Sequence, residues 1–284
     1  MARGLHLDPA AVTVRLIATD LDGTLLRDDL SVSPRTRRAL DAVRAAGIEV
    51  VPVSARQPWG IRMIAEQAGF TGWALGGNGA QCQHLTTGEV LFEAHVDVAV
   101  QQPVAAALAE RLPGVLFVSV RSGGEVFVAQ DGYAQLAHFE DHKRDPATMG
   151  GHELTAVLAE PSLKFIVRHA EWAPSELIME VRALGLDGFA VTHSGAPFVE
   201  ILADGVNKAW AVAKLSAHLG IDRAEVLAFG DAPNDAELLA WAGRGVAMAN
   251  AHPEAVAAAD EIAGGNEEDG VAAVLELLLA DLPR

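Results

Sequence analysis

The sequence contains a single cysteine, Cys82, among its 284 residues. An intramolecular disulfide and a metal site built from several cysteines are therefore both excluded. One thiol in a chain of this length is typical of the reducing cytoplasm, and we expect the protein there. A secretory signal is not expected either, because the apolar stretch 12–18 is short and is interrupted by Arg15.

Basic residues and long apolar runs are also scarce. The chain has 21 Lys and Arg against 38 Asp and Glu, which gives a formal net charge of −17. Nucleic acids and anionic membranes bind basic surfaces, so we expect neither as a partner. No apolar run approaches the roughly 20 residues that a membrane-spanning helix needs. A phosphate substrate is not excluded, because a bound cation and a few basic groups can reverse the charge locally.

Segments with strand and helix patterns alternate in the first 80 residues. Apolar, β-branched runs predict strands at 12–19, 48–53 and 73–75. A helix is predicted over 36–46, with Ser33 as its N-cap and Gly47 as its stop, and a second helix over 58–68. This alternation predicts an α/β fold, with a parallel sheet covered by helices.

The pattern changes after Cys82 and returns after about residue 206. Hairpins are predicted from 115–120 with 125–129 and from 189–192 with 197–202, together with a strand at 163–168 and a helix at 175–184. From 208 onward, helices are predicted at 208–219, 233–241, 253–259 and 271–280, and strands at 226–229 and 245–249. We therefore expect a core formed by residues 1–83 and 191–284, with an α+β module inserted at 84–190.

Two carboxylates follow the first predicted strand, in the run Asp20-Leu21-Asp22-Gly23-Thr24. Ligands of an open parallel sheet bind beyond the carboxyl ends of its strands. Two acids one residue apart, before a glycine turn, can hold a divalent cation, and the alternative is a plain acidic turn. A calcium loop is excluded, because Thr24 stands at the next ligand position and the terminal Glu is absent.

Two single residues stand at other element ends. Ser54 ends the second predicted strand, where a hydroxyl beside backbone N–H groups suits a phosphate oxygen, and a helix N-cap is the alternative. Lys208 opens a predicted helix, where a cation opposes the helix dipole. This unfavourable placement indicates that Lys208 faces an anion, and an exposed lysine is the alternative.

A polar run, Gly230-Asp231-Ala232-Pro233-Asn234-Asp235, follows the predicted strand 226–229. Asp231 and Asp235 are four residues apart, so both can face one side of a helical turn. An N-cap with a proline in the first turn is the alternative. Three polar side chains within five positions exceed what capping requires, and we favour a functional site.

In this order the four motifs resemble those of the haloacid dehalogenase superfamily, and within it the Cof-type hydrolases, whose large α/β cap follows the third core strand. Two further traits match, namely Gly77-Asn78-Gly79-Ala80 and the pairing of Glu200-Ile201 with Gly205-Val206-Asn207-Lys208. The resemblance covers essentially the full length. Ser54-Ala55-Arg56 stands where Thr-Gly-Arg is frequent, and 202–204 lacks a common proline. Neither departure removes a catalytic group.

The resemblance implies a Rossmann-like α/β core with an inserted cap and the activity of a Mg²⁺-dependent phosphatase. Asp20 would attack phosphorus and form an aspartyl-phosphate. Asp22 would protonate the leaving alcohol and later deprotonate the attacking water. Mg²⁺ would be held by the Asp20 carboxylate, the Asp22 backbone carbonyl and Asp231, because magnesium prefers hard oxygen ligands.

The remaining motif residues would bind or support the phosphoryl group. The resemblance implies that its oxygens are held by Ser54, Ala55, Lys208 and Asn234. Asp235 would orient Lys208 or a metal-bound water. Arg56 would help to bind phosphate or would form a surface ion pair, and the sequence leaves both readings open.

The expected substrate is a small phosphorylated metabolite, such as a sugar phosphate or a phosphorylated cofactor, selected by the cap. A phosphomutase on the same fold is the first alternative, and the absence of an arginine cluster in 84–190 counts against it. A non-catalytic sensor of phosphorylated metabolites is the second, and the presence of both Asp20 and Asp22 counts against that. The sequence leaves open whether the chain is a monomer or a homo-oligomer.

Histidines and tryptophans elsewhere carry weaker signals. His138 and His142 are four residues apart, but the zinc-protease pattern needs a Glu directly after the first His. We interpret this pair as a solvated or substrate-facing patch of the cap. Trp59, Trp73 and Trp210 are interpreted as core or pocket-wall residues.

Overall fold

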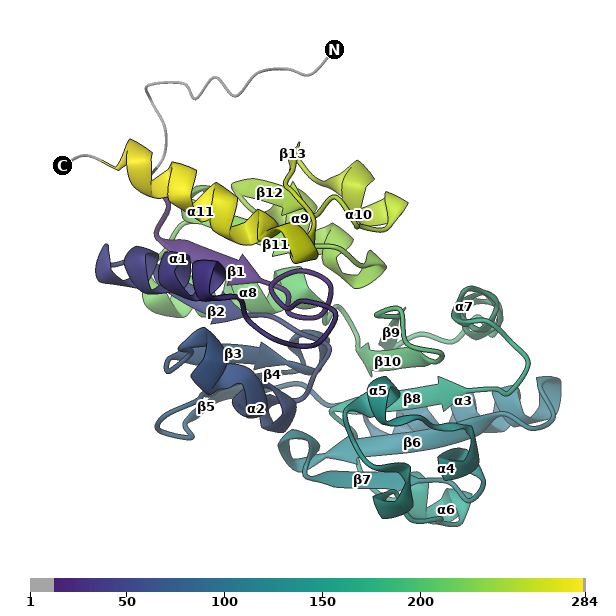
Figure 1. The fold of residues 1–284 in the computed structure, drawn as a ribbon. Coiled ribbons are helices and arrows are strands. Elements are labelled where there is room, and N and C mark those ends of the chain that lie inside the picture. The colour runs from purple at the N-terminus through teal and green to yellow at the C-terminus, as the bar shows by residue number, and fades with distance from the viewer. Residues whose placement is uncertain (1–12, 283–284) are drawn as a thin grey trace.

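The computed structural model describes residues 13–282, which form a core and a cap (Figure 1). The core contains the first and last described segments, drawn purple and yellow, and the cap contains the teal middle of the chain. None of the helices in residues 13–282 has the length and apolar character needed to cross a bilayer. Val12, the first residue of the first predicted strand, lies outside the described residues.

The core is organised around a five-stranded parallel sheet. Its central strand β1 (Leu16–Thr19) is flanked by β2 (Glu49–Pro52) and β11 (Val226–Gly230), and β12 (Arg244–Ala247) and β13 (Glu261–Ile262) follow beyond β11. β3 (Trp73–Gly76) continues this sheet through one parallel bridge between Val53 and Leu75. It also pairs antiparallel with β4 (Gln81–His84), which pairs with β5 (Val90–Glu93).

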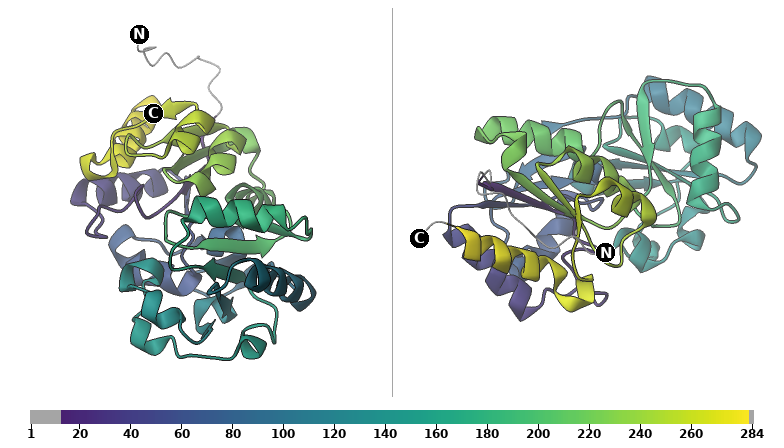
Figure 2. Two further views of the ribbon diagram at one scale, coloured as in Figure 1. Left: turned by 90° about the vertical axis from the view of Figure 1, so that its right-hand side faces the viewer. Right: turned by 90° about the horizontal axis from the view of Figure 1, so that it is seen from above.

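Helices cover both faces of the core sheet. One face packs against α1 (Pro34–Ala45), α2 (Pro58–Ala68) and α11 (Gly270–Asp281), and α1 and α11 lie side by side (Figure 2). The other face packs against α8 (Lys208–Leu219), α9 (Ala236–Trp241) and α10 (Pro253–Ala258). Ile17 points to the first face and Leu16 and Ala18 to the second, as the alternation of a strand requires.

The cap is built on a five-stranded antiparallel sheet. The strand order is β7 (Val126–Ala129), β6 (Leu116–Arg121), β8 (Lys164–Arg168), β10 (Val199–Ala203) and β9 (Phe189–Thr192). Helices α3 (Val98–Arg111), α7 (Pro174–Ala183) and α6 (Leu154–Val157) pack on one face. The short helices α4 (Tyr133–Leu136) and α5 (Phe139–His142) lie on the opposite face of the cap sheet.

Most predicted elements are confirmed, and the α/β class with a cap is confirmed with them. Helices α2 and α8 have the predicted bounds. In α1, the Ser33 hydroxyl accepts a hydrogen bond from the Thr36 N–H, and Gly47 follows with a φ of 82°. The sequence predicted neither α3 nor the β4–β5 hairpin, because α3 lacks a clear polar stripe and β4 is polar.

The two sheets divide the chain differently from the predicted boundaries. The β4–β5 hairpin pairs with β3, so the core sheet continues to Glu93, beyond the expected end at residue 83. The expected end of the cap at residue 190 falls inside β9, although β9 and β10 both pair within the cap sheet. We therefore propose that the cap comprises residues 94–203.

Candidate active site

The four sequence motifs meet at one edge of the core sheet. Asp20 follows β1, Ser54 follows β2, the run from Asp231 follows β11, and Lys208 opens α8. Parallel strands present their carboxyl ends at the same edge, so residues separated by up to 215 positions become neighbours there. The predicted site residues are thus brought together beside the cap.

Lys208 lies between two carboxylates and is buried. Its Nζ donates to Asp20 Oδ1 at 2.7 Å and to Asp235 Oδ1 at 2.5 Å. Burial would lower the pKa of Lys208, but the two carboxylates outweigh it and raise the pKa. Burial raises the pKa of Asp20 well above its ordinary value, and Lys208 opposes that shift. The lysine therefore stays a cation beside Asp20, and its predicted contact with Asp235 is present.

Asp231 completes a group of three carboxylates. Ligand atoms of Asp20, Asp231 and Asp235 all lie within 4.8 Å of one another. Asp231 accepts a hydrogen bond from Thr24 Oγ1 at 2.6 Å, and a β-carbon at Gly23 would collide with its carboxylate. Burial raises the pKa of Asp231 to about 6. Three crowded carboxylates with hard oxygens are the donor set that a divalent cation such as Mg²⁺ prefers.

Asp22 lies apart from this group of carboxylates. Its Oδ2 and Oδ1 accept hydrogen bonds from Arg56 Nε and Nη2, both at 2.6 Å. Arg56 is buried rather than on the surface, with 8% of its side chain exposed, whereas 40% of the Asp22 side chain is exposed. The Asp22 carboxylate is thus held at the base of the cleft. Its predicted contribution to a metal site is the backbone carbonyl, which stays a prediction.

The phosphate-binding residues of the sequence prediction surround the same point. Ser54 is buried, and its hydroxyl accepts a hydrogen bond from the Arg56 N–H at 3.1 Å. The carbonyl of Ala55 accepts one from Lys164 Nζ of the cap at 3.1 Å. Asn234 is buried, and its Oδ1 has no partner among residues 13–282. That amide oxygen remains available to a ligand.

A buried polar chain joins the core loops to the cap strands. Asn234 Nδ2 donates to Asn78 Oδ1 at 2.8 Å, and Asn78 Nδ2 donates to Glu200 Oε2 at 2.9 Å. Lys164 Nζ donates to the other oxygen of Glu200 at 2.5 Å. The sequence indicated Asn78 and Glu200 only as traits of the resemblance, and it gave no signal for Lys164. These hydrogen bonds fix the cap strands β8 and β10 against the core loops that carry Ala55, Asn78 and Asn234.

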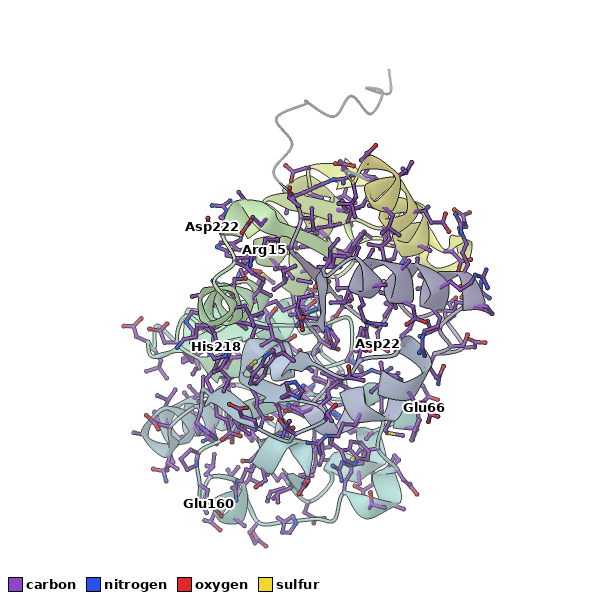
Figure 3. All side chains as sticks on the ribbon, turned by 90° about the vertical axis from the view of Figure 1, so that its left-hand side faces the viewer. Arg15, Asp22, Glu66, Glu160, His218 and Asp222 are labelled. Carbon is purple, nitrogen blue, oxygen red and sulfur yellow. The ribbon has the colours of Figure 1, made fainter. Side chains whose placement is uncertain are left out.

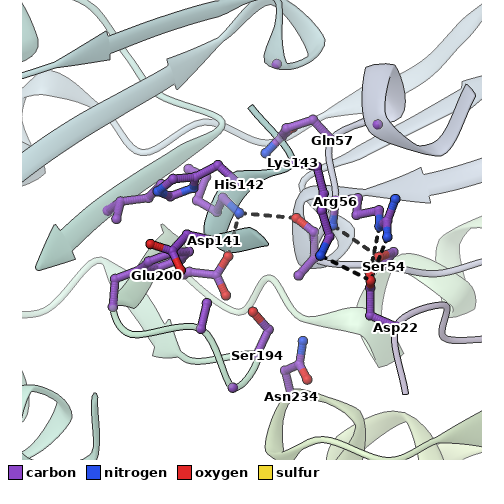
Figure 4. A pocket seen from close by; sticks show the side chains of 18 of the residues that line it. Asp22, Ser54, Arg56, Gln57, Asp141, His142, Lys143, Ser194, Glu200 and Asn234 are labelled. Atoms are coloured by element: carbon purple, nitrogen blue, oxygen red, sulfur yellow. Dashed lines mark hydrogen bonds and ion pairs between the residues drawn. The ribbon is translucent and has the colours of Figure 1, made fainter. Parts of the chain in front are cut away.

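A cleft of about 370 Å³ lies between the core and the cap, above these residues (Figure 4). Its cap wall carries aromatic rings: His142 stacks on Phe198 with centroids 4.5 Å apart, and Phe127 meets His142 edge-on. Burial, and then nearby Lys164, lower the pKa of His142 to about 3. His142 therefore faces the substrate space as a neutral ring.

The histidines and tryptophans noted in the sequence have different surroundings in the structure. His138 is exposed and does not line the cleft, so only His142 fits the interpretation as a substrate-facing residue. Trp59 lines the cleft, and the Arg144 guanidinium lies over its ring at 5.3 Å. Trp73 is buried in the core, and Trp210 packs against Phe92. Lys143, which also lines the cleft, was missed because nothing in the sequence sets it apart.

The fold and the site together define a phosphoryl-transfer enzyme, and comparison with known proteins places it in a family. Residues 17–275 match the model of haloacid dehalogenase-like hydrolases, and the chain belongs to that family. It is a phosphatase that hydrolyses phosphoric monoesters.

Three similar proteins illustrate the family. The HMP-PP phosphatase of Cronobacter sakazakii is 31% identical over 249 residues, covering 86% of this chain and 87% of that protein. The 5-amino-6-(5-phospho-D-ribitylamino)uracil phosphatase of Bacillus subtilis is 31% identical over 271 residues. The match covers 92% of this chain and 96% of that protein. The crystal structure of a haloacid dehalogenase-like hydrolase from Bacteroides thetaiotaomicron superposes with a TM-score of 0.74 at 28% identity. The superposition covers 94% of this chain and 100% of that one.

Proposed function

We propose that the protein is a Mg²⁺-dependent phosphatase that releases phosphate from a small phosphorylated metabolite through an aspartyl-phosphate on Asp20. The observation that carries this proposal is the placement of Asp20. Its carboxylate is paired with Lys208 and lies beside Asp231 and Asp235, below a cleft of metabolite size. A nucleophile, a fixed cation and a cation-binding carboxylate group at one point are the parts that phosphoryl transfer needs.

The proposed reaction has two displacements. An Asp20 oxygen attacks phosphorus, the bond from phosphorus to the ester oxygen breaks, and Asp22 gives that oxygen a proton. A water, deprotonated by Asp22, then attacks the aspartyl-phosphate, which releases inorganic phosphate and restores Asp20. Lys208 and the Ser54 hydroxyl lie where they can donate to the transferred group, and the free amide oxygen of Asn234, an acceptor, can contact a metal ion or a water beside it.

The carboxylates of Asp20 and Asp231, together with the Asp22 carbonyl, would hold the magnesium ion, and Asp235 would support the site through its contact with Lys208. Their oxygens are hard donors, and burial raises the pKa of Asp20 and of Asp231, so a bound cation would stabilise the charged form of both carboxylates. Bound Mg²⁺ would supply positive charge next to the phosphoryl group. The names of the relatives support a small substrate, since both HMP-PP and a phosphorylated ribitylaminouracil are small molecules.

The test is phosphate release from a panel of esters that includes sugar phosphates and phosphorylated cofactors. We expect release with Mg²⁺, loss of release after chelation, and poor recovery with Ca²⁺, whose longer bonds and higher coordination number disturb in-line geometry. Full activity after exhaustive chelation would contradict the metal assignment. A phosphomutase would form an isomer without free phosphate, and a sensor would bind esters without changing them.

A further inference from the structure

Lys143 reaches from the cap toward the core site. It follows α5 directly, and its Nζ lies 3.9 Å from Asp22 Oδ1 (Figure 4). Only 20% of the Lys143 side chain is exposed, because most of it packs along the wall of the cleft. The cap thus places a positive charge directly over the carboxylate that we assign to proton transfer.

The ammonium group of Lys143 has no hydrogen-bond partner among residues 13–282. A distance of 3.9 Å is too long for a hydrogen bond, and the same Asp22 oxygen already accepts one from Arg56 at 2.6 Å. The acid two residues before Lys143, Asp141, is held by Arg168 at 2.6 Å. The three N–H groups of the Lys143 ammonium are therefore free to donate to an oxyanion that enters the cleft.

The other two cations of the cleft are already occupied. Arg56 donates two side-chain hydrogen bonds to Asp22, and Lys164 is bound to Glu200 and to the Ala55 carbonyl. Among the described residues that line the cleft, Lys143 is therefore the lysine or arginine left to meet an incoming anion. It comes from the cap, on the side from which a leaving group must enter.

We propose that Lys143 is a specificity-determining residue, which binds an oxyanion carried by the leaving group next to the scissile bond. The inference rests on the proposed function, because it takes Asp22 as the proton donor to the ester oxygen. A cation 3.9 Å from that donor lies beside the ester oxygen, not beside the three phosphoryl oxygens near Lys208. The oxyanion can be a second phosphoryl group, as in a diphosphate, or a carboxylate near the ester carbon.

The test compares phosphate compounds that carry this anion with counterparts that lack it. The diphosphate also has the better leaving group, so for that pair the change of preference between the wild type and a Lys143 variant is what counts. One pair is 2-phosphoglycolate against 2-hydroxyethyl phosphate, and the other is methyl diphosphate against propyl phosphate. For the diphosphate, water replaces the bridging oxygen at the terminal phosphorus, and the products are methyl phosphate and inorganic phosphate. We expect the wild-type protein to prefer the anionic member of at least one pair by about 10-fold or more in kcat/KM, as a hydrogen bond to a charged group supplies.

Two Lys143 variants separate charge from backbone effects. Lys143 has a φ of 52°, which glycine adopts freely, so Lys143→Gly removes the cation without straining the chain. Lys143→Arg keeps the charge. We expect Lys143→Gly to reduce the preference for the anionic member about 10-fold and Lys143→Arg to retain most of it. Lys214→Met, which removes a lysine of α8 outside the cleft, should leave all rates unchanged.

The outcomes identify which statement fails. The proposal is supported if the wild type prefers the carboxylate ester or the diphosphate and Lys143→Gly loses that preference. The preferred compound then identifies the oxyanion. Hydrolysis of all four esters without a preference for either anion overturns the proposal and leaves the phosphatase function intact. A preference of the same size in Lys143→Gly as in the wild type also overturns it. Absence of Mg²⁺-dependent hydrolysis of every ester, in a panel extended to other phosphates, counts against the proposed function.

Discussion

The guanidinium group of Arg56 binds both carboxylate oxygens of Asp22, each at 2.6 Å. Arg56 belongs to the loop after β2, and Asp22 to the loop after β1, so the pair joins two neighbouring loops of the site. A two-point contact fixes the orientation of a carboxylate as well as its position. Asp22 lies near the middle of the molecule, where core and cap meet (Figure 3).

We therefore predict that Arg56→Ala lowers kcat by about 10- to 100-fold, because a misplacement of about 1 Å at a reacting group can cost that much. Steady-state kinetics on the best ester measures the change. Arg62→Ala is the matched control, since Arg62 lies on the neighbouring helix α2 and contacts Gln83 at the surface. A variant with unchanged kcat and a raised KM would mean that Arg56 binds phosphate instead.

Asp20→Asn should lose turnover and keep its fold. The amide is nearly isosteric with the carboxylate but cannot act as the anionic nucleophile, so we expect kcat to fall by at least about 10³-fold. Lys208 retains Asp235, and removal of a buried charge should leave the melting temperature unchanged or higher. Asp41→Asn, at an exposed position of α1, is the control. Multiple turnovers by pure Asp20→Asn protein would remove Asp20 from the nucleophilic role.

Removal of one charge from the buried ion pair of Lys164 and Glu200 should lower the free energy of unfolding. Glu200 is fully buried, so Glu200→Gln leaves the Lys164 charge without a counterion, and we expect a loss of about 3 kcal/mol in the free energy of unfolding. Glu160→Gln breaks the ion pair with Arg121, in which Glu160 is 68% exposed, and should cost less than about 1 kcal/mol. Figure 3 shows Glu160 at the end of the cap away from Asp22. Equal losses in urea unfolding would show that Lys164 is not desolvated.

His142 should make the protein sensitive to acid. Its pKa is lowered to about 3 in the folded state, chiefly by burial, against an ordinary value of 6.5. Between these values the unfolded chain binds the proton more tightly, so stability falls as pH drops below 6.5 and is unaffected above it. From pH 6.5 to 4.5 we expect the wild type to lose about 2 kcal/mol more than His142→Gln. Parallel stability curves for the two proteins over this range would contradict the assignment.

Local patterns in the sequence predicted the core well for a physical reason. The strands β1, β2 and β11 are apolar runs followed by polar motifs, and Ser33 and Gly47 mark the limits of α1 by local hydrogen bonding and backbone geometry. The motif residues follow those strands, so their convergence follows from the parallel sheet alone. Their chemical types indicated sites for a cation and for an anion, and the resemblance to the haloacid dehalogenase superfamily added phosphoryl transfer.

Contacts between core and cap could not be predicted in the same way. Lys143 and Lys164 are ordinary lysines in the sequence, and they gain a role only because the cap folds over residues more than 100 positions away. The pairing of Arg56 with Asp22 depends on the relative placement of two loops. The predicted domain boundary near 190 rests on a change in local sequence pattern. In the structure, β9 and β10 form hydrogen bonds within the cap sheet, and a local pattern does not reveal such pairing.

The parallel pairing of β1 with β11 has a consequence for how the chain folds. Leu16 pairs with Glu49 on one side and with Val226 on the other, so one edge of β1 closes early in synthesis and the other waits for some 180 further residues. The strands of the cap sheet all lie within 116–203 and are complete before β11 is made. Because long loops are slow to close, the cap should form first and the catalytic sheet last. Until that closure, the exposed edge of β1 is the part of the chain most open to mispairing.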